Sequence, residues 1–205
     1  MPELSYIHHF EPGADPAAPP VLLLHGTGGN EHDLLTLGRQ LCPGSALLSP
    51  RGDVLEQGMP RFFRRFAEGV FDLADVERRT HAVADFVAAA AGRYRFNAAA
   101  LIAIGFSNGA NLAASLLLLR PETLASAVLF RPMVVLEPTQ LPELGGKQVL
   151  LSSGRVDPIV PADHPARLAG LLQRGGAEVT LRIHAAGHNL VQADFIAAAK
   201  FLARP

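Results

Sequence analysis

The sequence predicts an α/β fold built on a mostly parallel open sheet with helices on both faces. Short apolar runs alternate with longer amphipathic stretches along almost the whole chain. The runs are continuously apolar, which is typical of strands buried on both faces of a parallel sheet. The chain has 205 residues, 49% of them hydrophobic and 18% charged, enough to bury one core. We therefore expect a single domain over 1–205.

Six segments are predicted to be strands: Val21–Leu24, Ala46–Ser49, Leu101–Ile104, Ala127–Phe130, Val149–Ser152 and Val179–Ile183. Helical periodicity places further elements between them, at Leu34–Leu41, Leu73–Ala90, Leu112–Leu119 and Ile196–Phe201. For the first helix we expect Asn30 as the N-cap, with Glu31 and Asp33 in the first turn. Open sheets of this kind bind their ligands at the carboxyl ends of the strands.

Two segments lack such patterns. Pro12–Pro20 is proline-rich and is predicted to be a surface loop. Arg51–Gly69 is the least regular part of the chain. The connection from Arg131 to Gln148 is too short to form a separate helical lid, so we expect a minimal lid or none.

Ser107 lies in Gly105-Phe106-Ser107-Asn108-Gly109, between a predicted strand and a predicted helix. A tight strand-to-helix turn would project its hydroxyl from the top of the sheet, with glycines where side chains would collide. The pentapeptide alone is a weak signal, and its placement is what favours a nucleophile over a glycine-rich structural turn.

A serine hydroxyl needs a base, and the base needs an acid to orient it. Asp157 follows the strand Val149–Ser152, and His188 follows the strand that ends near Ile183, in the order serine, acid, histidine. Asp157 could instead be a turn or N-cap residue, and Asp163 is a rival acid beside the next helix. Among the other histidines, His184 is expected to point toward the surface.

The segment His25-Gly26-Thr27-Gly28-Gly29 follows the first buried strand. Its glycines let the backbone N–H of Thr27 point into the site, where it would form an oxyanion hole with the N–H of Asn108. A phosphate cradle is disfavoured, because the nucleotide-binding glycine spacings are absent. His25 is predicted to brace the loop.

Aromatic and cationic side chains mix in Pro60–Gly69. The phenylalanines could line a substrate pocket or simply pack. Arg61, Arg64 and Arg65 are expected to pair with Glu56, Glu68 or Asp72, with attraction of an acidic substrate as the alternative. The predicted pocket residues are Phe62, Phe63, Phe66, Met133, Ile159 and Val160.

The net charge of −1 gives no electrostatic reason to expect nucleic acid or membrane as a partner. The start of the sequence has no signal-peptide pattern, and the one cysteine, Cys42, fits a reducing compartment. No metal-ligand spacing is present.

These residues resemble the phospholipase/carboxylesterase family of α/β hydrolases, and look closest to its bacterial carboxylesterase branch linked to hydroquinone-stress operons. The matching segments cover essentially the whole chain: LLLHGTGGNEHDLL, LLSPRGDVLEQGMPRFFRRFAEGVFDLADV, IAIGFSNGANLAASLLL, GRVDPIVP and AAGHNL. The resemblance implies the α/β-hydrolase fold, no cofactor and a cytoplasmic location. It also implies the triad Ser107, Asp157 and His188, with oxyanion N–H groups from Thr27 and Asn108.

One departure from that branch is Arg131, because the resemblance leads us to expect a histidine near Phe130 or Arg131. The predicted function is a serine hydrolase that cleaves short-chain carboxylic esters of small molecules through an acyl-enzyme. A thioesterase or lysophospholipase is the alternative among hydrolases, and a non-catalytic ligand-binding protein on this fold is the alternative class. A dienelactone hydrolase is disfavoured, since that group typically has cysteine where this chain has Ser107. A homodimer is left open.

Overall fold

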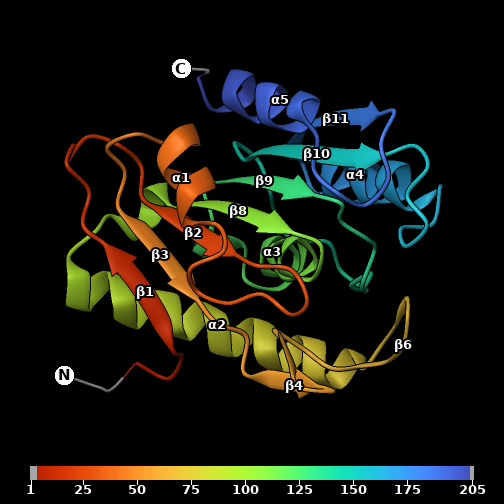
Figure 1. The fold of residues 1–205 in the computed structure, drawn as a ribbon, viewed down its shortest axis with the longest axis horizontal. Helices are drawn as coiled ribbons and strands as arrows, with labels where there is room; N and C mark the ends of the chain where they lie inside the picture. Colours follow the sequence, from red (N-terminus) through yellow and green to blue (C-terminus); the bar gives the residue numbers. More distant parts are fainter. Residues whose placement is uncertain (1–3, 204–205) are drawn as a thin grey trace.

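A seven-stranded sheet runs through the centre of the protein, in the order β1-β3-β2-β8-β9-β10-β11 (Figure 1). The structure is a computed structural model and describes residues 4–203. The sheet strands are β1 (His8–Glu11), β2 (Val21–Leu24), β3 (Leu47–Pro50), β8 (Ile102–Phe106), β9 (Ser126–Phe130), β10 (Gln148–Gly154) and β11 (Glu178–His184).

All neighbouring strands of this sheet pair in parallel except β1, which runs antiparallel to β3. Every residue of β2 and β3 is buried, as the continuous apolar runs predict. The mostly parallel α/β sheet is therefore confirmed. The edge strand β1 was not predicted, because its sequence His8-His9-Phe10-Glu11 is half-buried and carries no apolar run.

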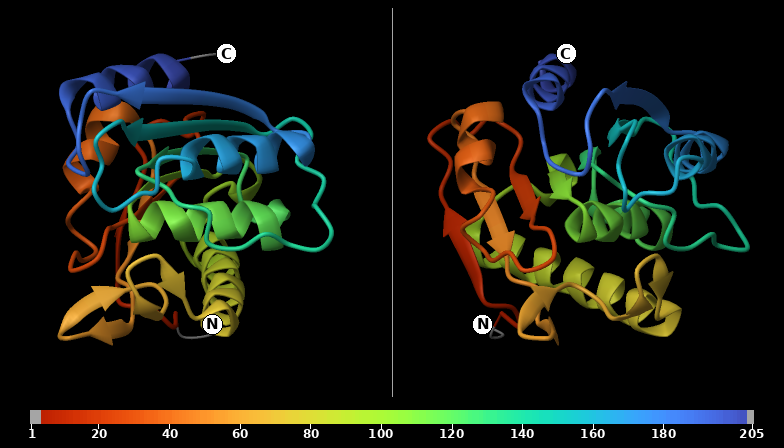
Figure 2. Two further views of the ribbon diagram at one scale, coloured as in Figure 1. Left: turned by 90° about the vertical axis from the view of Figure 1, so that its right-hand side faces the viewer. Right: turned by 45° about the vertical axis from the view of Figure 1, so that its right-hand side comes forward.

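Helices cover both faces of the sheet (Figure 2). α1 (Leu35–Leu41) and α5 (Gln192–Leu202) contribute to one apolar cluster, while α2 (Leu73–Tyr94), α3 (Asn108–Leu119) and α4 (His164–Arg174) contribute to the other. Short 3₁₀ turns at Ala98–Ala100 and Pro121–Thr123 precede β8 and β9. The connection between β9 and β10, residues 131–147, contains no helix, in agreement with the absence of a helical lid.

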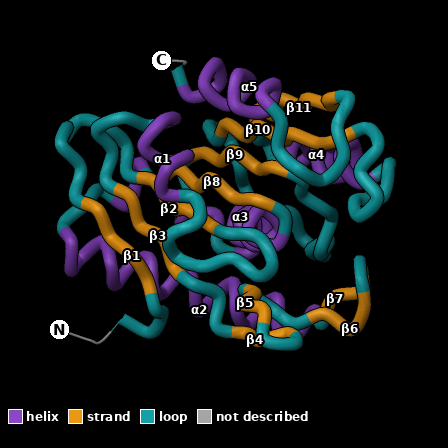
Figure 3. Tube along the Cα trace, in the orientation of Figure 1, coloured by secondary structure: helices purple, strands orange, loops and turns teal. Residues whose placement is uncertain are grey.

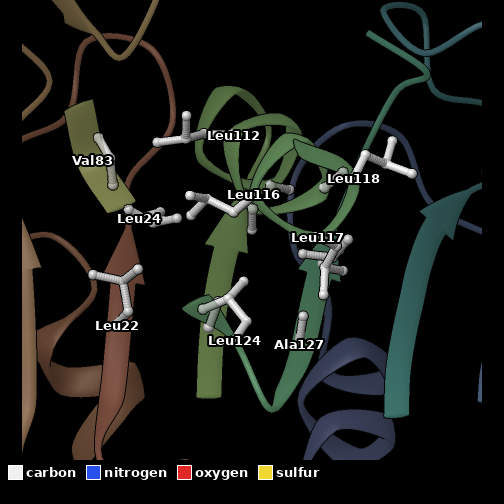
Figure 4. Packing of buried hydrophobic residues seen from close by; sticks show 14 of the residues in the cluster. Leu22, Leu24, Val83, Leu112, Leu116, Leu117, Leu118, Leu124 and Ala127 are labelled. Atoms are coloured by element: carbon white, nitrogen blue, oxygen red, sulfur yellow. The ribbon is translucent and has the colours of Figure 1, made fainter. Parts of the chain in front are cut away.

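The central helix α3 is buried from Asn108 to Leu118. In Figure 4 its residues Leu112, Leu116 and Leu117 pack over side chains of β2 and β9, and Leu116 is 0% exposed. Removing a side chain of this kind costs about 2–5 kcal/mol in typical cores. This packing fixes the start of α3 against the ends of β2 and β8, where the candidate site lies.

Two small hairpins lie between residues 54 and 71, mostly within the stretch Arg51–Gly69 that the sequence indicated only as irregular (Figure 3). The first joins β4 (Val54–Glu56) to β5 (Met59–Arg61), and the second joins β6 (Arg65–Ala67) to β7 (Val70–Phe71). Gln57 and Gly58 turn the first hairpin with φ of 52° and 82°, the backbone that a two-residue turn of this type requires. Strands of two or three residues are too short to show a period in the sequence.

The expected N-cap of α1 was wrong. The helix begins at Leu35, and the side chain of Asn30 accepts a hydrogen bond from the His32 N–H in a local turn. Glu31 pairs with Arg51 and so is not part of a first helical turn. Within residues 4–203, no helix has the length and apolar character needed to cross a membrane.

Candidate active site

Ser107 occupies a sharp turn between the end of β8 and the start of α3. Its backbone has φ of 51° and ψ of −114°, a conformation that side-chain-bearing residues rarely adopt. The neighbouring glycines make the turn possible, because a Cβ at Gly105 would lie 2.7 Å from Ala110 N and one at Gly109 would lie 2.0 Å from Leu24 O. The Ser107 N–H donates to Phe130 O at 2.8 Å, which ties the turn to β9.

His188 joins this serine to an acid. Its Nε2 lies 2.9 Å from Ser107 Oγ, and its Nδ1 lies 2.8 Å from Asp157 Oδ2. Since an ionised carboxylate only accepts, the proton is on Nδ1, and Nε2 is free to accept from the serine hydroxyl. Asp157 is held in turn by the N–H groups of Ile159 and Val160, which donate to its Oδ1 at 2.8 and 3.1 Å. The structure thus brings together the three residues that the chain order indicates.

Thr27 and Asn108 lie beside Ser107, and both line a small cavity with it. In residues 4–203 neither the Thr27 N–H nor the Asn108 N–H has a protein acceptor. Asn108 is the first residue of α3, so its N–H also lies at the positive end of a twelve-residue helix. The two N–H groups are available to bind an anionic oxygen.

His25 braces the loop that carries Thr27. It is 1% exposed, its Nδ1 lies 2.6 Å from Gly26 O, and its Nε2 accepts from the Gly52 N–H at 2.9 Å. These partners require a neutral ring with the proton on Nδ1. Burial lowers the pKa of His25, which favours the same neutral form.

The hairpin β4–β5 supports this loop from the other side. Arg61 Nη1 donates to Thr27 Oγ1 at 2.6 Å, and the Gly28 N–H donates to Pro60 O at 2.9 Å. Arg61 is 2% exposed and lies 3.1 Å from Glu56 Oε2, so its charge is balanced.

Two cavities flank Ser107. The larger, of about 220 Å³, is lined by Thr27, Arg65, Glu68, Phe106, Ser107, Ile159 and His188. The smaller, of about 20 Å³, is lined by Thr27, Arg61, Arg65, Glu68, Phe71, Ser107, Asn108, Asn111 and Met133. The walls therefore mix a few apolar side chains with an arginine and a glutamate that face both cavities.

Of the six predicted pocket residues, two line the cavities beside Ser107 and four do not. Met133 lines the smaller cavity and Ile159 the larger. Val160 is buried and is not among the lining residues, but its N–H supports Asp157. The three phenylalanines do not line either cavity: Phe62 and Phe63 are 0% exposed, and Phe66 is 75% exposed.

These placements have simple physical causes. The Phe62 ring packs 4.7 Å from the His25 ring, and the Phe63 ring packs edge-on against Phe71 at 5.7 Å, so both belong to the core under the site. Phe66 points outward from the short strand β6, whose neighbour Arg65 faces the cavities instead. Period-two alternation of the strand separates the two side chains.

The arginines of this stretch pair with carboxylates, as predicted. Arg64 Nη2 lies 2.8 Å from Asp72 Oδ2, and Arg65 Nε lies 3.0 Å from Glu56 Oε1. Arg65 also binds Glu68, its partner in the cavity wall. Sequence reasoning missed Arg65 and Glu68 as wall residues, although both lie in the stretch that the aromatic and cationic pattern marked.

The other acid and the other histidine that the sequence offered near these strand ends, Asp163 and His184, lie outside the triad. Asp163 precedes α4 and pairs with Arg167 at 3.1 Å, on the surface. His184 was expected to point toward the surface, which is wrong: its Nε2 lies 3.1 Å from the hydroxyl of the buried Ser152. Among the described residues, no group of three or more His, Cys, Asp and Glu side chains could hold a metal ion.

The protein has a mostly parallel sheet with a strained serine turn after a central strand. The acid and the histidine lie on loops that follow later strands. This combination defines the α/β-hydrolase class. A model of the phospholipase/carboxylesterase family matches residues 7–204. The chain belongs to this family, and it is a hydrolase enzyme.

Individual relatives agree. The chain is 45% identical over 185 residues to MhqD of Bacillus subtilis (strain 168), by its name a hydrolase, covering 90% of this chain and 92% of that protein. It is also similar to the crystal structure of a Bacillus cereus carboxylesterase, with a TM-score of 0.95, 44% identity, and coverage of 97% and 93% of the two chains. A carboxylesterase from Mesorhizobium loti gives a TM-score of 0.88 at 34% identity, covering 94% of this chain and 91% of that one.

Proposed function

We propose that this enzyme is a serine hydrolase that cleaves short-chain carboxylic esters of small molecules through an acyl-enzyme. The observation that supports this best is the unbroken set of hydrogen bonds from Asp157 through His188 to Ser107, with contacts of 2.8 and 2.9 Å. The family and its carboxylesterase members supply the reaction class.

In the proposed reaction, Ser107 Oγ bonds to the ester carbonyl carbon while its proton passes to His188 Nε2. The carbonyl electrons move onto oxygen, and the oxyanion accepts from the N–H groups of Thr27 and Asn108. Collapse of this intermediate breaks the ester bond, and the leaving alcohol takes the proton from His188. Water then adds to the acyl-enzyme in the same way and releases the acid. Asp157 keeps the imidazole oriented and stabilises its charged form.

The test is fluorophosphonate labelling combined with hydrolysis of p-nitrophenyl butyrate. We expect labelling at Ser107 in the wild type, and a loss of kcat on the order of 10⁴–10⁶-fold in Ser107→Ala. His188→Gln is expected to lose activity to a similar extent, whereas His81→Gln, at an exposed position on α2, serves as the matched control. An alanine variant that retained a tenth of the activity would move the nucleophile elsewhere.

Acyl-chain preference follows from the cavity beside Ser107. A buried methylene contributes about 0.8 kcal/mol, or roughly fourfold in kcat/KM, only while apolar walls enclose it. Here the cavity has about 220 Å³, and Arg65 and Glu68 form part of its wall. We expect kcat/KM for p-nitrophenyl esters to peak at about C2–C4. A rate that still rose at C12 would favour the thioesterase or lysophospholipase alternative, and absence of labelling would favour a ligand-binding protein.

The proposal extends to the setting of the enzyme. A cytoplasmic location is proposed because Cys42 is a free thiol, which suits a reducing compartment. A net charge of −1 gives no attraction to nucleic acid or anionic lipid, so the proposed partner is the small-molecule ester. The oligomeric state is left open between a monomer and a homodimer, and light scattering would distinguish them.

A further inference from the structure

Arg131 is a fully buried cation directly after β9. Its exposed fraction is 0%, and its φ is 57°, in the left-handed region that a side-chain-bearing residue adopts at a cost. Its own N–H donates to Ser152 O of β10 at 2.8 Å. A buried charge on a strained backbone persists only where the surrounding structure holds it firmly.

The guanidinium holds the backbone on both sides of His188. Arg131 Nε donates to Gly187 O at 3.0 Å, and Nη2 donates to Asn189 O at 2.8 Å. Gly187 and Asn189 are the two chain neighbours of His188 in the loop between β11 and α5 (Figure 1). One rigid group thus binds the carbonyls that precede and follow the histidine.

Asp194 fixes the arginine in turn. Arg131 Nη1 lies 2.8 Å from Asp194 Oδ1, and Nη2 lies 2.8 Å from Oδ2, a bidentate pair. Asp194 is also 0% exposed, accepts from Ser152 Oγ at 2.6 Å, and accepts from the Val191 N–H at 2.8 Å at the start of α5. The pair therefore joins the ends of β9 and β10 and the start of α5 to the histidine loop.

We propose that Arg131 is a positioning residue for catalysis: it sets the place of His188 through the carbonyls of Gly187 and Asn189. This inference rests on the proposed function, in which His188 must reach Asp157 and Ser107 at once. Arginine suits the task because it presents five donors in a rigid plane, whereas lysine offers a point charge on a flexible stem. The donors that Asp194 leaves unpaired are satisfied by the carbonyls of Gly187 and Asn189, so the hydrogen bonds that let the charge be buried also fix the backbone on both sides of His188.

The test separates positioning from stability. In Arg131→Met the carboxylate of Asp194 is left buried without its cation, so the variant is expected to be much less stable. The double variant Arg131→Met/Asp194→Asn removes both charges and is expected to regain thermal stability. Arg131→Lys keeps the charge and loses the planar donors. Arg167→Met, which removes an exposed arginine with two carboxylate partners, is the matched control.

We expect kcat for p-nitrophenyl butyrate to fall about 10- to 100-fold in Arg131→Lys and in the folded double variant, with KM changed less than about threefold, since a misplacement of about 1 Å can cost this much. Fluorophosphonate labelling is expected to slow by a similar factor. A double variant that recovered both its stability and its wild-type kcat would overturn the inference.

A second readout does not depend on turnover. The Nδ1–H proton of His188, held by Asp157, is expected to give a downfield proton NMR signal that disappears in His188→Gln. We expect this signal to be lost or broadened in Arg131→Lys and in the double variant, at temperatures where they are folded. Its full retention would contradict the inference even if the enzyme proved not to be an esterase. Failure of the proposed function would show separately, as a wild type that is neither labelled nor active.

Discussion

At the scale of single residues, the backbone of Ser107 has an unfavourable conformation. Its φ of 51° and ψ of −114° put the Cβ in a crowded position that glycine would avoid. Such strain typically costs about 1–3 kcal/mol, and it is retained where function requires it. Here the turn aims the hydroxyl at His188 Nε2, 2.9 Å away.

This strain predicts that Ser107→Gly is more stable than Ser107→Ala. Relief of the positive φ outweighs the extra entropy of glycine in the unfolded chain, which costs about 0.5–1 kcal/mol. A net gain of about 1 kcal/mol corresponds to a Tm about 2–4 °C higher for a protein of this size. Calorimetry on the two variants checks this, and both are expected to be inactive. A Ser107→Gly variant that melted at the same temperature as Ser107→Ala, or below it, would mean that the strain at this turn does not exceed the entropic cost of glycine.

Chain order was enough to predict the neighbours of this serine. Asp157 and His188 each follow a strand of a parallel sheet, and strand exits of such a sheet lie at one edge. The role of Arg131 could not be predicted, because its partners are backbone carbonyls and Asp194, 63 positions later in the chain. Phe62 and Phe63 were misplaced for a related reason: composition indicates an apolar surface nearby but does not say which side chains face the core.

At the scale of elements, the hairpin β4–β5 supports the loop that carries Thr27, whose N–H is a proposed oxyanion donor. Arg61 at the end of β5 binds Thr27 Oγ1, and Pro60 O accepts from the Gly28 N–H. His25 anchors the start of the same loop to Gly52. The Thr27 N–H thus depends on contacts from two directions for its orientation.

Arg61→Met is expected to lower kcat/KM about 10- to 100-fold, since misorienting one oxyanion donor approaches the loss of that donor, which typically costs 10²–10³-fold. Stability is expected to fall less than for a lone buried charge, because Glu56 keeps Arg65 as a partner at 3.0 Å. Arg64→Met is the control, because the Arg64 side chain is exposed, pairs with Asp72 and lines neither cavity. Steady-state kinetics on both variants measures whether Arg61 contributes to catalysis. Equal kcat/KM values in the two would remove the hairpin from the mechanism.

The elements also show which patterns a sequence can display. The central parallel strands could be predicted because burial on both faces makes them almost entirely apolar. The edge strand β11 is not buried, and its signal was the alternation of Val179, Leu181 and Ile183 with polar residues. The edge strand β1 could not be predicted because it is only half-buried, and the four hairpin strands could not because they are two or three residues long. The start of α1 was misplaced because Asn30 and Glu31 form other interactions, a local turn and an ion pair with Arg51.

At the scale of the whole molecule, ionisable groups link folding to pH in two separate windows. Hydrogen bonding to Arg51 lowers the pKa of Glu31 to about 2. Burial opposes ionisation of Asp194, but hydrogen bonds from Arg131 and Ser152 outweigh it and lower its pKa. In the unfolded chain the pKa values of both carboxyl groups are near 4. Both carboxylates therefore stabilise the fold above about pH 4, and this stabilisation is lost as pH falls below that value. Between pH 7 and 5 other groups must account for any change.

Histidines are those groups. Burial lowers the pKa of both His25 and His164 from the ordinary value of 6.5, because a charged ring would lose hydration. Below pH 6.5 these two histidines therefore bind protons in the unfolded chain but not in the native protein, so the free energy of unfolding falls as pH decreases. A histidine that is protonated in the unfolded chain but stays neutral in the native protein lowers the free energy of unfolding by about 1.4 kcal/mol per pH unit, which corresponds to about 3–6 °C in Tm. We expect the Tm to drop between pH 6.5 and 5.5, with a shallower slope in His25→Gln than in the wild type. His81→Gln, at an exposed position of α2, is expected to keep the wild-type slope. A Tm that stayed constant or rose on acidification over this interval would show that the fold holds neither the His25 ring nor the His164 ring neutral.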